Sequence, residues 1–175
     1  MPINLIIRQE EASNKPVIKN IHDQAFRQPN EGKLVQELRS LPAFDPRLSL
    51  VADLDSIIVG HILFFPIFIR TENDEFQTLS LGPVAVLPEF QSRGIGGKLI
   101  LSGHETATKF GYKSVVLLGH PSYYPRFGYK IAAFWNLTNP WGIHNEAFLA
   151  IELNEGYLDD KPGLCVYPEV FNDAA

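Results

Sequence analysis

Hydrophobic residues recur along the chain at two spacings, and the spacing distinguishes predicted helices from predicted strands. In the first third, apolar residues three or four positions apart predict one helix that runs to Pro29 and a second that ends before Pro42. Ser13 and Asn14 are suitable caps for the first helix. Later apolar stretches are rich in β-branched and aromatic side chains, which is typical of strands. The predicted strands cover residues 4–9, 48–54, 57–70, 76–87, 113–119, 129–134 and 147–153, and a last extended segment covers 163–171.

The order of these elements predicts the sheet. Residues 71–75 are polar and form the tip of a hairpin between strands 57–70 and 76–87, the first of which we expect to bend at its proline. A helix that ends near Phe110 separates strand 76–87 from strand 113–119, and such a crossover joins parallel strands. The predicted fold class is therefore α+β, with a mixed, mostly antiparallel sheet.

Composition and charge narrow the class of protein. A chain of 175 residues fits one domain, residues 1–175, and its 45% hydrophobic and 20% charged residues are typical of a globular protein. The 15 Lys and Arg against 20 Asp and Glu leave a net charge of -5, which argues against a nucleic-acid partner. Neither a membrane-spanning stretch nor a signal peptide is evident, so we expect no membrane partner and a cytoplasmic location.

The stretch "FQSRGIGGKL", residues 90–99, concentrates three glycines and two cations in this acidic chain. It lies where a predicted strand gives way to a predicted helix, and free backbone N–H groups at such a junction can bind an anion. The spacing matches neither a P-loop nor a dinucleotide fingerprint, because Leu99 stands where each motif needs another residue. A purely structural glycine turn is the alternative.

This turn resembles a known motif. "VLPEFQSRGIGGKLI" resembles the acetyl-CoA motif of the GNAT N-acetyltransferases, Gln/Arg-x-x-Gly-x-Gly/Ala. With "VVLLGHPSYYPRFGYK", it is similar to the YhbS-like branch of that superfamily, and the order of elements fits nearly the whole chain. The resemblance implies a three-layer α/β/α fold whose sheet is splayed at the acetyl-CoA site. It also implies acetyl-CoA as co-substrate and no metal.

The resemblance also implies which residues bind the co-substrate. The pantetheine arm would pair with backbone in the gap between the strand that ends near Val86 and the strand that ends near Gly119, and a backbone N–H near Val86 would polarise the thioester carbonyl. The pyrophosphate would lie on the N–H groups of residues 91–97, and the side chains of Arg93 and Lys98 would add positive charge. The implied binding residues are Val84, Ala85, Val86, Gln91, Ser92, Arg93, Gly94, Ile95, Gly96, Gly97 and Lys98.

Tyr124 is the candidate general acid. In the family, a tyrosine four residues before a Gly-Tyr pair often serves as the acid, and here that pair is Gly128-Tyr129. A phenol is protonated at neutral pH and can donate to a thiolate. Packing in the core is the alternative, and a shift of one residue would give the role to Tyr123.

The general base is less clearly marked. His120, where the branch commonly has an acidic residue, is either a general base or a turn residue, and a water chain is a further alternative. We expect His61 to be a hydrogen-bonded sheet residue and His104 to be exposed on its helix.

Other residue types carry weaker signals. Phe134, Trp135 and Trp141 either form a loop over the acceptor or pack between the last strands. Cys165 is more typical of a buried thiol than of a nucleophile, and as the one cysteine it cannot form an internal disulfide. No cluster has metal-ligand spacing.

Together these features predict an N-acetyltransferase that moves the acetyl group of acetyl-CoA to a primary amine by direct attack, without an acetyl-enzyme. The expected acceptor is a small molecule, such as a metabolite amine or an amino-acid-like compound. Two alternatives are a protein N-terminal or lysine acetyltransferase and a catalytically silent CoA-binding regulator. The family often forms homodimers. The sequence does not identify the acceptor, the general base or the oligomeric state.

Overall fold

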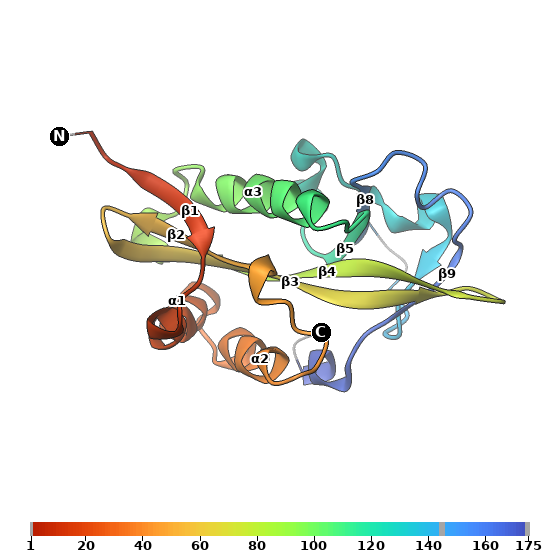
Figure 1. The fold of residues 1–175 in the computed structure, drawn as a ribbon, viewed down its shortest axis with the longest axis horizontal. Coiled ribbons are helices and arrows are strands. Elements are labelled where there is room, and N and C mark those ends of the chain that lie inside the picture. Colours follow the sequence, from red (N-terminus) through yellow and green to blue (C-terminus); the bar gives the residue numbers. More distant parts are fainter. Residues whose placement is uncertain (1, 144–145, 174–175) are drawn as a thin grey trace.

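A mixed sheet runs through the centre of the molecule and is covered by helices on both faces (Figure 1). The computed structural model describes residues 2–143 and 146–173. Neighbouring strands are antiparallel except for the pairs β4–β5 and β7–β9, which confirms the predicted mixed, mostly antiparallel sheet. The strands of the main path are, in spatial order, β1 (Leu5–Gln9), β2 (Ser49–Leu54), β3 (Ile57–Arg70), β4 (Glu75–Val86), β5 (Ser114–Leu118), β8 (Phe148–Glu152) and β6 (Lys130–Ile131). Two further strands lie off this path: β9 (Gly163–Val166) pairs with the outer part of β3, and β7 (Leu137–Thr138) pairs with β9.

In the described part of the chain, three α-helices form the outer layers. Helices α1 (Lys15–Phe26) and α2 (Asn30–Arg39) lie on one face of the sheet, and α3 (Ile95–Lys109) lies on the other (Figure 1). Asn14 precedes α1 as predicted, but its Oδ1 accepts from the N–H of Glu11 rather than from α1. The arrangement confirms the expected α/β/α layers.

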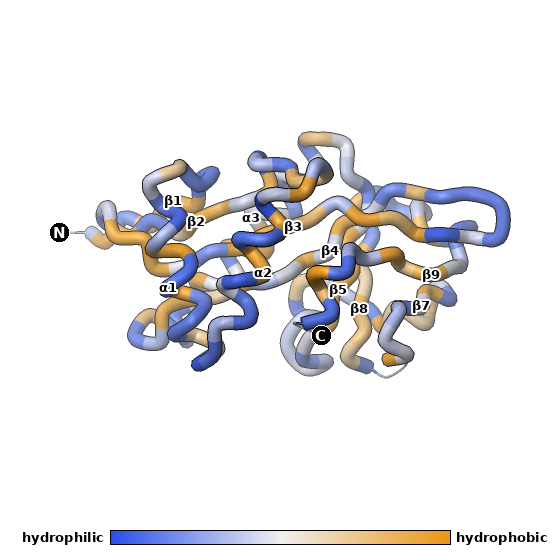
Figure 2. The backbone as a smooth tube through the Cα atoms, turned by 90° about the horizontal axis from the view of Figure 1, so that it is seen from below, coloured by the Kyte–Doolittle hydropathy of each residue, from blue (hydrophilic) through white to orange (hydrophobic). Residues whose placement is uncertain are grey.

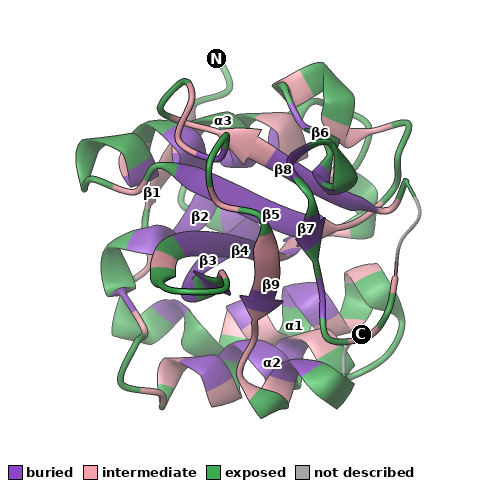
Figure 3. Cartoon of the chain, turned by 90° about the vertical axis from the view of Figure 1, so that its right-hand side faces the viewer, coloured by how far each residue is buried: buried purple, intermediate pink, exposed green. Residues whose placement is uncertain are grey.

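Alternation along β3 supplies a core to each face. Leu63 and Phe65 are buried against α1 and α2, while Ile62 and Phe64 are buried against α3. Figure 3 shows the central strands buried along much of their length, and Figure 2 shows that the hairpin tip between β3 and β4 is hydrophilic. Because β3 is apolar on both faces, it reads in the sequence as one continuous hydrophobic run.

Strands β4 and β5 separate soon after they pair. Their register includes only Leu79 with Val115 and Ser80 with Val116, whereas β4 continues beside β3 as far as Val86. Within the described chain, the edge of β4 beyond Ser80 therefore has no β5 partner. The separation opens the sheet on the side where the glycine turn follows β4.

Two expectations about the backbone need correction. The predicted strand 129–134 is a strand only at Lys130–Ile131, and Ala132–Trp135 is a 3-10 helix, because this turn buries Ala132 and Trp135 in the core. The extended segment 163–171 ends at Val166, and the 3-10 helix Glu169–Asp173 follows. The β3–β4 register shifts between Ile62 and Phe64, where β4 has one extra residue, and the ladder continues through Pro66, where a bend stays a prediction.

Candidate active site

The glycine turn connects β4 to α3 through the 3-10 helix Pro88–Phe90. Ser92 (φ 61°) and Gly94 (φ 78°) both have the left-handed conformation, which glycine adopts without strain. The first helical hydrogen bond of α3 runs from the N–H of Lys98 to the carbonyl oxygen of Gly94, at 3.1 Å. The N–H groups at the first three positions of α3 therefore have no acceptor within the helix and can bind an anion at its positive end.

Gly96 and Gly97 lie in close contact with aromatic side chains. The 3-10 helix Tyr124–Phe127 packs against the first turn of α3. A Cβ on Gly96 would lie 3.2 Å from the Tyr123 hydroxyl, and a Cβ on Gly97 would lie 3.2 Å from the Phe127 ring. A side chain at either position would be in tight contact with an aromatic residue, which favours glycine here whether or not an anion is bound.

Two side chains of the turn are engaged with its own backbone. Gln91 Nε2 donates to the carbonyl oxygen of Val86 at 2.9 Å, which ties the turn to the end of β4. Arg93 Nη2 donates to the carbonyl oxygen of Glu89 at 3.1 Å, and its guanidinium lies over the Phe90 ring. Glu89 and Lys98 are exposed.

A groove of about 980 Å³ runs along the unpaired edge of β4 and over the glycine turn, and we call it the turn groove. Every predicted co-substrate residue except Arg93 lines it. It also contains residues that sequence reasoning did not assign to the co-substrate, notably the cation Arg126. The full lining is Ala25, Phe26, Val84, Ala85, Val86, Phe90, Gln91, Ser92, Gly94, Ile95, Gly96, Gly97, Lys98, Leu101, His120, Tyr123, Tyr124, Arg126 and Phe127.

A second cavity, of about 350 Å³, lies on the α1 and α2 side of the same opening, and we call it the aromatic cavity. It brings together the end of α1, the start of α2, the middle of β4, the end of β5 and the C-terminal segment. The lining residues are Phe26, Glu31, Leu34, Ser80, Leu81, Gly82, Pro83, Val84, Leu118, Gly119, His120, Tyr124, Trp141, Tyr167 and Phe171. Sequence reasoning missed Glu31, Tyr167 and Phe171, which no local motif marks.

The two cavities share Phe26, Val84, His120 and Tyr124. Tyr124 is half-buried, with its ring 5.1 Å from that of Tyr123 and 5.7 Å from that of Tyr129. Burial, and secondarily the neighbouring Tyr123, raises the pKa of Tyr124 to about 12, so the phenol stays protonated near neutral pH. His120 is exposed at the same junction. Tyr123 lines the turn groove but not the aromatic cavity.

The three aromatic residues of the loop region have different positions. Trp141 lines the aromatic cavity, Trp135 is buried in the core, and Phe134 is 68% exposed. The packing interpretation therefore holds for Trp135, while a loop of Trp141 over the acceptor stays a prediction. Cys165 is buried as expected, and burial raises the pKa of its thiol to about 12.

His104 does not lie on an exposed helix face, contrary to the sequence prediction. It is 8% exposed, and its Nε2 forms a 2.8 Å hydrogen bond with the Tyr129 hydroxyl. Tyr129 lies 25 residues further along the chain, so no helical pattern around His104 marks this partner. Burial lowers the pKa of His104 to about 4.

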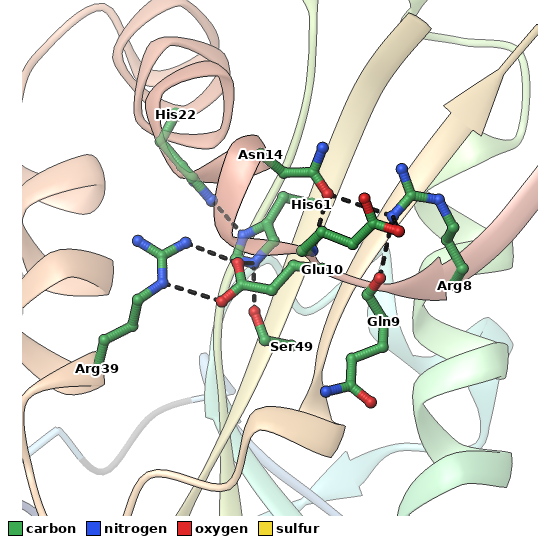
Figure 4. Close-up of polar contacts among 9 residues, drawn as sticks. Arg8, Gln9, Glu10, Asn14, His22, Arg39, Ser49 and His61 are labelled. Carbon is green, nitrogen blue, oxygen red and sulfur yellow. Dashed lines mark hydrogen bonds and ion pairs between the residues drawn. The ribbon is translucent and has the colours of Figure 1, made fainter. Parts of the chain in front are cut away.

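His61 is a hydrogen-bonded sheet residue, as predicted, and belongs to a buried polar network (Figure 4). Its Nδ1 lies 2.8 Å from His22 Nε2, and its Nε2 lies 2.8 Å from Ser49 Oγ. Beside these hydrogen bonds, Arg39 forms a two-point ion pair with Glu10, from Nε to Oε1 at 3.0 Å and from Nη2 to Oε2 at 2.6 Å. Burial lowers the pKa of His22 to about 3 and that of His61 well below its usual value, so both rings are neutral.

Two further properties concern the described residues, 2–143 and 146–173. Among them, no group of three or more His, Cys, Asp or Glu side chains is arranged to hold a metal ion. No helix in this part of the chain is long and apolar enough to cross a membrane.

Comparison with known proteins places the chain among acetyltransferases. Residues 7–132 match the acetyltransferase (GNAT) domain. The chain is 32% identical to the uncharacterized N-acetyltransferase YhbS of Escherichia coli (strain K12) over 96% of this chain and 99% of YhbS. The crystal structure of E. coli YhbS in complex with CoA has a TM-score of 0.91 and 30% identity, and covers 98% of this chain and 94% of that one. A GNAT family acetyltransferase from Brucella melitensis in complex with acetyl-CoA has a TM-score of 0.78 and 34% identity, over 96% and 98% of the two chains.

Proposed function

This chain belongs to the acetyltransferase (GNAT) domain family, and we propose that it transfers the acetyl group of acetyl-CoA to the primary amine of a small molecule. As a member of this family it is an N-acetyltransferase with acetyl-CoA as co-substrate. The small-molecule acceptor, the direct attack and the residue roles below are the proposal.

The observation that carries the proposal is the meeting of two cavities at the point where β4 and β5 separate. The turn groove contains free helix N–H groups with Lys98 and Arg126, which suits a polyphosphate. The aromatic cavity has neither Lys nor Arg among its described lining residues, which suits a different ligand. A reaction between two substrates needs such a shared junction, and Tyr124 and His120 lie in it.

We assign a part of the turn groove to each segment of acetyl-CoA. The pantetheine arm would pair with the backbone of Val84, Ala85 and Val86, where β4 has no β5 partner. The pyrophosphate would bind to the N–H groups of residues 91–97. Gln91 would act through its bond to Val86 O, which fixes the distance between these two parts.

The reaction follows from these positions. The amine nitrogen attacks the thioester carbon, a backbone N–H near Val86 stabilises the oxyanion, and collapse of the intermediate breaks the C–S bond. Tyr124 donates a hydrogen bond to the departing sulfur, and a raised pKa keeps that donor in place. The proton lost by the amine passes to His120, and His120 then delivers it through water to the CoA thiolate, which restores the neutral imidazole. The products are the amide and CoA thiol.

His120 is the proposed base because it lines both cavities and an imidazole can accept a proton near neutral pH. We expect His120→Gln to lower kcat by about 10²-fold or more, the usual contribution of a general base. The acetyl-CoA dissociation constant should stay within a factor of two or so of wild type, because glutamine keeps a polar group of similar size. A kcat unchanged in this variant would assign proton removal to water.

Thermal unfolding tests the co-substrate assignment. Acetyl-CoA and CoA should each raise the midpoint, since a ligand at a hundredfold excess over its dissociation constant adds about 2.7 kcal/mol of stability. ATP should not. No shift with either CoA form would reject the proposal. A shift without CoA thiol release for any amine would instead support a silent CoA-binding regulator.

A further inference from the structure

Aromatic rings make up much of the wall of the aromatic cavity. The rings of Trp141 and Tyr167 lie 4.7 Å apart, and those of Tyr167 and Phe171 lie 5.1 Å apart, so three aromatic side chains form a continuous surface. Such surfaces favour another ring or an alkyl chain over a polar group. The volume of about 350 Å³ is a little over twice that of a cavity of about 150 Å³ that holds benzene. A body of one ring with a short chain fits this space.

The position of Trp141 is fixed by its own loop. Asn139 is buried and its Oδ1 accepts from the N–H groups of Trp141 and Ile143, at 3.1 and 3.2 Å. Its Nδ2 donates to the carbonyl oxygen of Ile143 at 2.6 Å. Trp141 Nε1 also donates to Asn172 Oδ1 at 3.0 Å. A side chain held at both its backbone and its ring can determine specificity, because little is left to order when a ligand binds.

The charged side chains that line the aromatic cavity indicate which charged groups a ligand there can have. Glu31 is half-buried, and both its oxygens accept from Gln28 Nε2, at 2.8 and 3.1 Å, which keeps the carboxylate in position. Among the described lining residues it is the only acidic one, and there is no Lys or Arg. An ammonium group is therefore attracted, a carboxylate is repelled, and a ligand with several ammonium groups lacks partners for them.

From these walls we propose that the acceptor is a monoamine with a ring-sized apolar body and no carboxylate, of the arylalkylamine class, with Trp141 and Glu31 as its specificity-determining residues. This inference rests on the proposed function, since it names the substrate class of the same site. It excludes the amino-acid-like acceptor and disfavours a polyamine or a lysine side chain of a protein.

The test compares amines that differ by one feature. 2-Phenylethylamine carries ring and amine, phenylalanine adds a carboxylate, ethanolamine lacks the ring, spermidine adds charges, and a short lysine peptide represents a protein. Release of CoA thiol from acetyl-CoA should give 2-phenylethylamine a kcat/KM about 10-fold or more above each of the others, as one apolar group commonly contributes. A preference for any of the other four would overturn the inference.

Matched variants test the two residues. Trp141→Ala should lower kcat/KM for 2-phenylethylamine about 10- to 100-fold and leave the value for ethanolamine nearly unchanged. Phe134→Ala, an exposed aromatic residue outside both cavities, is the control and should have no effect. Trp141→Phe should keep the preference, and it serves if the alanine variant does not fold. Loss of activity toward both amines alike in a folded Trp141→Ala would contradict the role.

Glu31→Gln should raise KM for 2-phenylethylamine about fivefold with little change in kcat, because it removes the attraction for the ammonium group. Glu37→Gln, on the same helix but outside the aromatic cavity, is the control. An unchanged KM in Glu31→Gln would remove Glu31 from the proposal.

Failure of the inference and failure of the proposed function give different results. If acetyl-CoA raises the unfolding midpoint and the lysine peptide is acetylated in preference, only the substrate class is wrong. If acetyl-CoA does not bind, the proposed function fails. If acetyl-CoA binds and no amine is acetylated, calorimetry of 2-phenylethylamine with the CoA-bound protein decides the inference alone: heat of binding that Trp141→Ala abolishes supports it, and no heat rejects it.

Discussion

Tyr124 and Tyr123 are neighbours in the chain with different surroundings. The Tyr124 ring lies beside Gly119, where a Cβ would come within 2.4 Å of it, and reaches the junction of both cavities. The Tyr123 hydroxyl lies over the first turn of α3, near Gly96, and the Arg126 guanidinium covers its ring at 4.7 Å. The geometry therefore favours a catalytic part for the first and a binding part for the second.

At the residue scale, Tyr124→Phe should lower kcat about 10²-fold or more, because the departing sulfur loses its donor. The acetyl-CoA dissociation constant should hardly change, since the ring and its packing are kept. Steady-state kinetics and calorimetry together separate these quantities. Tyr123→Phe is the matched control, with kcat kept and at most a weaker affinity for acetyl-CoA. The reverse pattern would exchange the two roles.

At the element scale, the position of α3 depends on two contacts. Gly103 lies over Phe64 of β3, where a Cβ would come within 2.1 Å of the ring, so the helix rests directly on the sheet. At the N-terminal side, Gln91 ties the turn before α3 to the end of β4. One contact sets the height of the helix above the sheet, and the other aligns its free N–H groups with the strand edge.

Gly103→Ala should destabilise the fold by about 1–3 kcal/mol, the usual cost of an added methyl group in a packed core. Denaturant unfolding measures this cost. Glu105→Ala, at an exposed position of the same helix, should change stability by about 0.5 kcal/mol or less. Equal stability of the two variants would mean that α3 does not rest on Phe64.

Gln91→Leu should weaken acetyl-CoA binding about 2- to 10-fold, in line with a net hydrogen-bond contribution of about 0.5–1.5 kcal/mol. The unfolding midpoint without ligand should stay close to wild type, because the bond is exposed. Gln36→Leu, an exposed change on α2, is the control. Calorimetry showing unaltered affinity for Gln91→Leu would reject the alignment role.

The elements that the sequence predicts well are those whose pattern is local. The apolar run of β3, the polar tip after it and the glycines before α3 each need only their neighbours in sequence. The turn at Ala132–Trp135 depends instead on burial of its side chains in a core made by distant segments. The site divides in the same way: the glycine turn follows from one motif, whereas Glu31, Tyr167 and Phe171 meet only through the tertiary fold.

At the scale of the whole molecule, buried histidines couple folding to protons. His22, His61 and His104 are neutral in the folded protein, chiefly because burial lowers their pKa values, for His22 to about 3 and for His104 to about 4. In the unfolded chain each takes up a proton near pH 6.5. Below that pH the unfolded state binds more protons than the folded state, so acid favours unfolding.

The free energy of unfolding should therefore be highest above about pH 7 and should fall as the pH drops below about 6.5, each histidine contributing up to about 1.4 kcal/mol per pH unit. The contribution of His104 should level off near pH 4 and that of His22 near pH 3. Urea unfolding from pH 5 to pH 8 measures the slope. His22→Gln keeps a polar partner for His61 and should flatten the slope by up to one histidine's share. Stability that is constant or rises toward pH 5 would contradict this account.

The separation of β4 from β5 also bears on how the protein behaves in concentrated solution. Beyond Ser80, the described chain offers no β5 partner to the edge of β4, and an open edge can pair with a strand of another molecule. If the pantetheine arm pairs with this edge, bound CoA also protects it against self-association. Stocks kept saturated with CoA should then stay monodisperse at concentrations where the ligand-free protein aggregates, and light scattering would show the difference.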